Sequence, residues 1–387
     1  MMKVAYLGKI QLSDVDLSYL HEAQKIVDIT YFMEVSPRFL QGPAFNIRQL
    51  YPKSGIFKAA EIYPEFKKYA DFIDINKFYV VNTCGRFWLL KSFWTHLLLL
   101  CFLLRGHFNV IHLCWPPNLY EFILYFLRKR MMLTVHDPFP HSGLDTAIVR
   151  FRRKVAFCFV PRLVILNKAQ QQEFINYYHV APERIISSRL SCYTYLQTVV
   201  PDTELVGRSD RYILFVGKIS PYKGLDYLLP AMKQAHCCCP DCRLVVAGGG
   251  AYYFDITEYK NAAYIDIRNR FIPESELVAL IAGAAFVVCP YTDATQSGVI
   301  MSAFAFNKPV LATNVGGLPE MVKHQHYGLI VKEKDIDELV DGIVSLWQQP
   351  ERLSSYATEI KRDYSAGPLS WQRVAEEMFS EYCKVTQ

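Results

Sequence analysis

The sequence contains no apolar run long enough to cross a bilayer. The longest run, Phe93–Leu104, is interrupted by His96 and ends at Arg105, short of the roughly 18 to 20 apolar residues that a membrane span needs. No secretory leader is recognisable and the 11 cysteines are irregularly spaced, so we expect reduced thiols in the cytoplasm. Low-complexity segments are missing too, and 51% of the residues are hydrophobic, which excludes a disordered or collagen-like chain.

A large net charge is also missing, but the two halves of the chain differ in sign. The total is +5, of which residues 1–200 contribute +10, with 24 basic and 14 acidic side chains, and residues 201–387 contribute −5. We therefore expect the first half to meet an anionic partner such as a membrane surface or a phosphorylated acceptor. A merely basic, solvated surface is the alternative. No nucleic-acid reading motif is present, so nucleic acid is not an expected partner.

One apolar stretch of the basic half runs directly into a cluster of cations. Leu119–Leu127 is followed by Arg128–Arg130, and an apolar face beside basic residues is typical of a helix that lies in the membrane interface. Such a helix predicts peripheral association with the inner face of a membrane. The alternative, for this stretch and for Phe93–Leu104, is a buried core helix with a basic last turn.

The length of 387 residues predicts two domains, and apolar strand-like runs alternate with helical stretches through both halves. This order indicates an α/β fold with two parallel, doubly wound sheets whose ligands lie in a crevice beyond the strand ends, between the domains. A polar stretch places the boundary near residue 205, giving domains 1–204 and 205–365. The predicted strands are 4–7, 78–81, 110–113, 132–135 and 163–166, then 212–216, 244–247, 262–265, 286–289, 309–312 and 328–331.

Two segments of the second half predict an anion site. Gly217–Gly224 is a tight, proline-containing turn between a strand and a helix, and it carries Lys218 and Lys223. Thr295–Ile300 also follows a strand and opens a helix, whose first amide groups can bind an anion. Two such sites in one domain favour a diphosphate. Solvated lysines in a loop are the alternative for the first segment alone.

Around these segments, the strings Ile213–Leu228, Val246–Gly250 and Asn307–Glu320 resemble the nucleotide-sugar half of retaining glycosyltransferases of family 4. The resemblance covers about residues 211–347, and Leu133–Gly143 looks like the family's strand-end His-Asp segment facing the donor sugar. It implies the GT-B fold, in which two Rossmann-like domains face each other across a cleft. The N-terminal domain would hold the acceptor, the second domain would hold the donor, and a C-terminal helix, 366–387, would cross back to the first.

The resemblance also implies roles for single residues. Lys223 matches the lysine on the donor diphosphate, Lys218 stands where the family usually has arginine, and His136 matches a histidine near the reacting sugar, although a buried structural histidine is the alternative. Glu320 is either a donor ligand or a first-turn helix residue. The remaining predicted donor-binding residues are Gly217, Arg270, Ile272, Asp293, Gln296, Ser297, Gly298, Val299 and Ser302. The acceptor side is assigned to Gly8, Lys9 and Asp137.

The sequence departs from the family at two carboxylates. The glutamates that the family carries on the donor sugar and on the ribose are Ala294 and Ser302 here, and the paired glycines of the first loop are reduced to Gly8 and Lys9. Asp293, Gln296 and Ser297 are therefore expected to hold the donor in a variant manner. A catalytically weak protein that binds sugar nucleotides, or acts as a scaffold in a glycan assembly complex, is the alternative.

The predicted function is a retaining, metal-independent glycosyltransferase without a cofactor. Lys218, Lys223 and helix amides would stabilise the departing diphosphate, and the acceptor would be a hydroxyl of a glycan or a polyprenyl-linked lipid, in surface polysaccharide or glycolipid synthesis. A zinc or redox site at Cys237–Cys242 is weighed against incidental loop thiols, which are favoured because no second ligand pair is evident.

Overall fold

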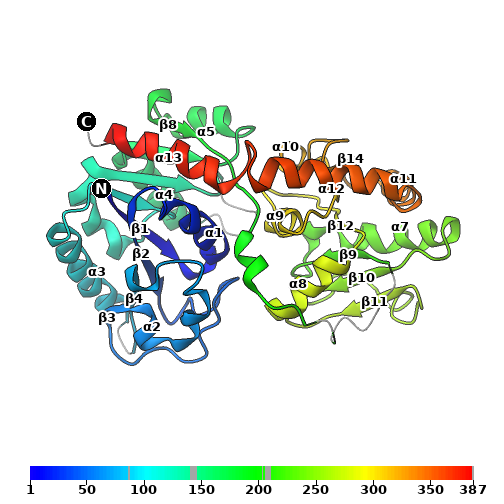
Figure 1. Ribbon diagram of the computed structural model, residues 1–387, viewed down its shortest axis with the longest axis horizontal. Coiled ribbons are helices and arrows are strands. Elements are labelled where there is room, and N and C mark those ends of the chain that lie inside the picture. Colours follow the sequence, from blue (N-terminus) through cyan, green and yellow to red (C-terminus); the bar gives the residue numbers. More distant parts are fainter. Residues whose placement is uncertain (86–87, 140–145, 203, 205–210, 386–387) are drawn as a thin grey trace. The chain divides into compact units, whose positions relative to one another are not determined.

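The computed structural model describes residues 1–85, 88–139, 146–202, 204 and 211–385, and they form two compact units. Unit 1 comprises Met1–Leu190 and Trp371–Gln387, and unit 2 comprises Ser191–Ser370 (Figure 1). The predicted boundary at residues 205–210 lies outside the described residues. The units divide earlier in the chain because residues after Leu190 bond to unit 2: Tyr193 N donates to Met301 O at 3.2 Å, and Asp202 N to Ser275 O at 3.0 Å.

Unit 1 is built on an eight-stranded sheet that is parallel except for one edge strand. The order is β3-β4-β2-β1-β5-β6-β7-β8, and β3 runs antiparallel to β4. Apolar runs form the central strands, which are buried on both faces as parallel strands must be. The bounds are β1 Lys3–Lys9, β2 Asp28–Val35, β3 Gly55–Lys58, β4 Phe78–Asn82, β5 Val110–Leu113, β6 Met131–Val135, β7 Arg162–Ile165 and β8 Ile185–Ser187.

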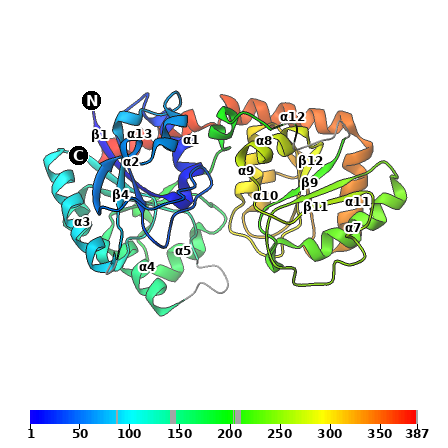
Figure 2. The same cartoon turned by 90° about the horizontal axis from the view of Figure 1, so that it is seen from below.

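Helices cover both faces of this sheet. Figure 2 shows α1 and α13 on one side and α3, α4 and α5 on the other. The second side contains the hydrophobic core in which α3, η4, α4 and α5 pack on the sheet. The 3-10 helix η4 replaces the α-helix expected at Leu119–Leu127. The bounds are α1 Ser13–Ala23, α2 Ala59–Ile62, α3 Trp88–Arg105, η4 Leu119–Arg130, α4 Ala147–Phe159, α5 Gln171–Tyr178 and α13 Trp371–Val385.

The C-terminal helix belongs to unit 1. Tyr382 Oη lies 2.9 Å from Tyr19 Oη on α1, and Arg189 forms a two-pronged ion pair with Glu377 at 2.8 and 3.0 Å. These contacts join α13 to the first unit although the whole of unit 2 lies between them in sequence. Within the described residues, none of the helices combines the length and the apolarity that a membrane-spanning segment requires.

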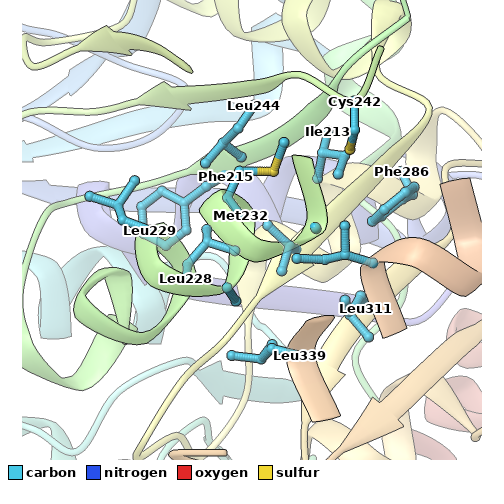
Figure 3. Packing of buried hydrophobic residues seen from close by; sticks show 14 of the residues in the cluster. Ile213, Phe215, Leu228, Leu229, Met232, Cys242, Leu244, Phe286, Leu311 and Leu339 are labelled. Atoms are coloured by element: carbon cyan, nitrogen blue, oxygen red, sulfur yellow. The ribbon is translucent and has the colours of Figure 1, made fainter. Parts of the chain in front are cut away.

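Unit 2 is a six-stranded, fully parallel sheet in the order β11-β10-β9-β12-β13-β14. Its core is a continuous cluster in which Phe215 and Leu244 of the strands meet Leu228 and Met232 of α7 (Figure 3). The bounds are β9 Ile213–Val216, α7 Leu225–Cys238, β10 Leu244–Ala247, β11 Ile265–Arg268, α8 Glu274–Gly283, β12 Phe286–Cys289, α9 Gly298–Ala305, β13 Val310–Thr313, α10 Leu318–Val322, β14 Gly328–Val331, α11 Ile336–Gln348 and α12 Pro350–Ser365.

One predicted strand is misplaced, and the strands β2, β3 and β8 were not predicted. The strand expected at 262–265 lies at Ile265–Arg268, because Ala262 N bonds to Tyr259 O and Ile265 N bonds to Ala262 O, which makes a turn of the earlier residues. The unpredicted strand β2 contains Glu34 within a largely apolar run. Glu34 is nevertheless buried, since an ion pair compensates its charge.

Candidate active site

The strand order of unit 2 reverses between β9 and β12, and the loops after these two strands meet. Thr292 N donates a hydrogen bond to Tyr222 O at 2.9 Å. Gly224 has φ 69°, and a Cβ there would lie 1.8 Å from Pro290 O, so only glycine fits. In a doubly wound sheet the crevice at such a reversal is the usual ligand site. The turn carrying Lys218 and Lys223 therefore borders it.

The side chain of Lys223 lies beside two aromatic rings at this point of the sheet. Its Nζ lies 3.7 Å from the centre of the Tyr291 ring and 5.2 Å from that of Tyr222. Burial lowers the pKa of Lys223 to about 8, partly opposed by Cys289. Aromatic faces attract a cation but do not neutralise it. The ammonium is therefore positioned, partly dehydrated and ready to bind an anion.

Tyr291 links this lysine to the start of α9. Ser297 Oγ donates to Tyr291 Oη at 3.3 Å and accepts from Ile300 N at 3.4 Å, which makes Ser297 the N-cap of the helix. Val299 faces Gly217, because a Cβ on Gly217 would lie 3.8 Å from Val299 Cγ2. The predicted residues Gly217, Lys223, Ser297, Gly298 and Val299 thus converge where the helix presents its first amide groups.

Other predicted donor residues lie at the edge of this group. Lys218 and Asp293 are exposed, one in each of the two loops, and Gln296 is partly buried. Glu320 is exposed in the first turn of α10. Ser302 Oγ donates to Gly298 O at 2.9 Å, so its hydroxyl serves the backbone of α9.

The guanidinium of Arg270 is bound within the protein. Both oxygens of the buried Glu276 accept from it at 2.7 Å, and Arg268 reaches Glu276 at 3.0 Å. The side chain of Arg270 therefore fixes the loop after β11. The segment from Arg270 to Ile272 packs beside Gly249, whose Cβ would lie 3.3 Å from the Arg270 carbonyl carbon. Recognition of a base there would fall to backbone groups.

Unit 1 holds a cavity of about 420 Å³ at the carboxyl ends of β1, β5 and β6. Here too the sheet order reverses, between β1 and β5. Apolar side chains make up much of the wall, and polar groups line the rest. The wall includes the predicted acceptor residues Lys9 and Asp137, with Trp115, Phe139, Val149 and Arg152 among their neighbours. Its volume is within the range of small-molecule sites.

Lys9 enters this cavity from a buried ion network. Its Nζ contacts Glu34 and lies 2.8 Å from Glu121 Oε1. Burial alone would lower the pKa of Lys9, but the carboxylates of Glu121 and Glu34 raise it above its usual value. The pKa of Glu121 is held below its usual range by Lys9 despite burial. Tyr120 adds a hydrogen bond to Glu34 at 3.0 Å. The network fixes the ammonium in place.

The adjacent His136 and Asp137 line different cavities. Asp137 lines the cavity of 420 Å³, whereas His136 lines one of about 30 Å³ with His112, Thr134 and Trp371. Burial lowers the pKa of His136 to about 4, so the imidazole is neutral at pH 7. Its Nε2 is buried without a hydrogen-bond partner in the described structure. The rest of the motif, His141 to Gly143, lies outside the described residues.

Gly8 supports the structure rather than touching the larger cavity. A Cβ there would lie 2.1 Å from Asp16 Oδ2 and 2.8 Å from the Tyr31 ring. Asp16 accepts hydrogen bonds from Tyr31 at 2.9 Å and from Tyr6 at 3.1 Å. Gly8 therefore gives room to a buried carboxylate beside the first strand.

Two groups of side chains have the spacing of metal ligands. Glu34, His96 and Glu121 lie within 4.8 Å of one another, but Lys9 already supplies the compensating cation between the carboxylates. In His326, Glu359 and Asp363, Arg362 binds both carboxylates. The Cys237–Cys242 segment is not among the groups of this spacing within the described residues. One of its thiols, Cys239, accepts from Gln348 at 3.3 Å.

Sequence reasoning did not identify several residues of these sites. Tyr291 was passed over, although it directly follows the Pro290 that ends a predicted strand. Trp115, Asn118 and Arg152 were missed because they come from segments that only the sheet order brings together. Their place just after a strand was the one sequence signal that could have indicated a site residue, and it applies to Tyr291 and Trp115.

Sequence comparisons match the second half of the chain to known proteins. Residues 210–349 match the family model described as glycosyl transferases group 1. An uncharacterized glycosyltransferase of Haemophilus influenzae is 28% identical over 172 residues, 43% of this chain and 49% of that protein. A D-inositol 3-phosphate glycosyltransferase of Corynebacterium aurimucosum is 29% identical over 239 residues, 57% of this chain and 56% of that protein. The chain thus spans about half the length of the curated relatives it matches.

Structural comparisons extend over the whole chain. Sucrose-phosphate synthase from Thermosynechococcus elongatus has a TM-score of 0.69 at 15% identity, with 100% of this chain and 99% of that chain covered. HepE of Anabaena in complex with UDP-glucose has a TM-score of 0.70 at 15% identity, with 99% and 100% covered. At this identity the likeness establishes the fold, which is GT-B, with two Rossmann-like units.

Proposed function

We propose that this protein is a retaining glycosyltransferase that uses a nucleotide-diphosphate sugar. The proposal is supported by the match of residues 210–349 to the group 1 glycosyltransferase model and by the GT-B fold of the chain. Unit 2 would bind the donor and unit 1 the acceptor. The observation that carries the proposal is the shared contact of Lys223 and Ser297 with Tyr291, because it joins a partly dehydrated ammonium to the positive end of α9 at the reversal of the sheet.

The proposed chemistry is electrostatic. When the sugar leaves, charge grows on the diphosphate, and an ammonium and helix amides fixed beforehand stabilise that charge without reorganising. Lys223 and the amides near Gly298 would do this, with Lys218 as a second, exposed cation. A phosphate oxygen would take the proton of the acceptor hydroxyl. The family resemblance implies no metal in this step, so chelation with EDTA is expected to leave transfer unchanged.

For the acceptor, we propose the cavity of unit 1. Lys9, Asp137 and Asn118 offer polar groups for a hydroxyl, and Trp115 and Phe139 offer apolar contact. This mixture supports a sugar of a glycan or a lipid-linked acceptor, in synthesis of surface polysaccharide or glycolipid at the inner face of a membrane. Sugars are commonly held by stacking on aromatic rings together with hydrogen bonds from polar groups.

Thermal stability in a panel of nucleotide sugars tests the donor site. A ligand of the native state raises the unfolding temperature, so one of the uridine, guanosine or adenosine diphosphate sugars should do so. Lys223→Ala should remove the shift, and Lys233→Ala, which alters an exposed lysine on α7, should keep it. Release of nucleoside diphosphate should follow the same order. If the panel gives no shift with the wild-type protein, the proposal fails.

A binding protein without turnover is the second candidate function. The observation that favours it concerns the two positions where the family carries glutamates. Ala294 has no polar side chain, and the Ser302 hydroxyl donates a hydrogen bond to Gly298 O. Binding of a nucleotide sugar without product, across the panel and with glycan and lipid-linked acceptors present, would support this candidate over the enzyme.

A further inference from the structure

The helix α3 exposes large apolar side chains on one face and buries three polar side chains on the other. Ser92, Thr95 and His96 are at most 3% exposed, and they lie on the face that packs on the sheet with Leu99 and Leu103. The opposite face is spaced at three- and four-residue intervals, as one side of a helix is. Six large apolar side chains on α3 are between 40% and 62% exposed: Leu89, Leu90, Phe93, Trp94, Leu98 and Leu104.

A helix on a water-facing surface keeps its apolar side toward the core, whereas α3 has large apolar side chains on both faces. The buried polar groups are partly satisfied within the helix, since Thr95 Oγ1 donates to Lys91 O at 2.8 Å and His96 Nδ1 lies 2.8 Å from Ser92 O. Leu99, Leu100 and Leu103 pack in the core, but six large apolar side chains of the opposite face stay exposed. A group of exposed apolar side chains of this kind marks an interaction site.

The 3-10 helix η4 contacts both α3 and α4, and η4 and α4 add further exposed apolar side chains. The Tyr125 and Phe159 rings are 5.5 Å apart, and His96 of α3 lies 5.3 Å from Tyr120 of η4. Eleven of the 17 exposed large apolar side chains of the described residues lie on α3, η4 and α4, and three lie in unit 2, so the feature is local. On η4 and α4 they are Leu119, Phe126, Ile148, Phe151 and Phe159. We call these eleven side chains the apolar helical surface.

Only cations accompany this surface. The three helices carry a single acidic residue, Glu121, and it is buried against Lys9. Seven basic side chains are exposed on the same helices: Lys91, Arg105, Arg128, Lys129, Arg130, Arg150 and Lys154. Apolar side chains that insert between acyl chains, with flanking cations at the level of the head groups, are what an anionic bilayer binds. A second copy in a symmetric dimer would instead bring seven cations against seven.

We infer that the apolar helical surface docks on a bilayer containing anionic phospholipid. The cavity of unit 1 opens beside it, since Val149 and Arg152 of α4 and Asn118 at the start of η4 line the cavity. An acceptor with a lipid tail can keep the tail in the bilayer while its head group enters the cavity. This second step, a membrane-embedded acceptor, rests on the proposed function, whereas the docking itself does not.

Flotation of the full chain with vesicles tests the docking. Phosphatidylcholine vesicles that contain phosphatidylglycerol should carry the protein, vesicles of phosphatidylcholine alone should carry much less, and added salt should weaken binding. Trp94→Ser with Leu98→Ser should lower the partition coefficient at least about tenfold, as expected for two large apolar groups left in water. Lys129→Gln with Lys154→Gln should also lower it. Val200→Ser, an exposed apolar position of unit 2, should not.

Two outcomes would contradict the proposed docking on an anionic bilayer. Equal binding to both vesicle types would show that anionic lipid is not what the surface binds. A concentration-dependent dimer in sedimentation that Trp94→Ser and Leu98→Ser abolish, without vesicle binding, assigns the surface to a second copy. As an independent measurement, brominated lipid should quench tryptophan fluorescence less in Trp94→Phe than in the wild-type protein. The shift of unfolding temperature with nucleotide sugar, measured on the same samples, separates a failure of docking from a failure of the proposed function.

Discussion

The ammonium of Lys223 lies 3.7 Å from the centre of the Tyr291 ring, and the hydroxyl of the same ring accepts a hydrogen bond from the N-cap Ser297. Tyr291 therefore contacts both the ammonium of Lys223 and the N-cap residue of α9, at the point where the strand order of unit 2 reverses. Because the tyrosine is fully buried, this arrangement is set by the core rather than by a mobile loop. Both groups that we propose for the diphosphate thus have a rigid support.

Replacing Lys223 by methionine keeps the side-chain volume and removes the charge. A hydrogen bond to a charged group contributes about 1.5 to 3 kcal/mol, so the affinity for nucleoside diphosphate should fall roughly 10- to 100-fold. Titration calorimetry with the nucleoside diphosphate of the best donor measures it. Lys233→Met is the matched control in the same unit. Unchanged affinity in Lys223→Met would remove the lysine from the donor site.

The affinity for nucleoside diphosphate should depend on pH through Lys223. Burial lowers the pKa of Lys223 to about 8, so the free protein loses this charge as the pH rises from 7 to 9.5 and binding should weaken over that range. Without ligand the sign is the opposite for folding. The lowered pKa of Lys223 makes the buried charge a cost that decreases as the pH rises above about 8 and is gone only above the ordinary pKa of 10.5. In Lys223→Arg the guanidinium stays charged and the decline in affinity should be absent. A decline that persists there assigns the pH dependence to another group.

Asp16 should make unit 1 less stable as the pH rises. Burial raises the pKa of Asp16 to about 7 despite hydrogen bonds from Tyr31 and Tyr6, so the folded state holds a proton that the unfolded state releases near pH 4. This contribution to the free energy of unfolding is present below pH 4 and is lost as the pH rises through 7. Urea unfolding measures the free energy of unfolding at pH 5 and pH 8. The value for Asp16→Asn relative to the wild-type protein should be higher at pH 8 than at pH 5. The exposed Asp71→Asn should show no such gain.

Lys9→Met should destabilise unit 1, because it leaves the carboxylates of Glu34 and Glu121 buried without their cation. Removing one partner of a buried ion pair typically costs about 3 to 5 kcal/mol in the free energy of unfolding. Lys25→Met breaks the exposed pair with Glu22, which should cost about 1 kcal/mol or less. Chemical denaturation of both variants compares the two. Equal, small losses would mean that the network of Lys9 adds little to the stability of the fold.

Much of the fold follows from local features of the sequence. Short apolar runs predict ten of the strands closely, because a strand buried on both faces needs apolar residues throughout. Gly224 and Ser297 mark helix starts through conformational and capping preferences that act within a few residues. The turn that carries Lys218 and Lys223 and the start of the helix at Gly298 could be predicted for the same reason, because both depend only on neighbouring residues.

Tertiary structure decided what depends on residues far apart in the chain. Glu34 is compatible with the buried strand β2 only because Lys9 and Tyr120 reach it, and the guanidinium of Arg270 is taken up by Glu276. The apolar run of α3 predicted a helix, but not that Ser92, Thr95 and His96 would be buried while six of its large apolar side chains stay exposed. Local sequence determines which segments become strands, helices and turns, since those preferences are short-ranged. Which side chains then share a buried charge, a cavity or a surface is decided by packing across the sheet order, which brings segments together regardless of their distance along the chain.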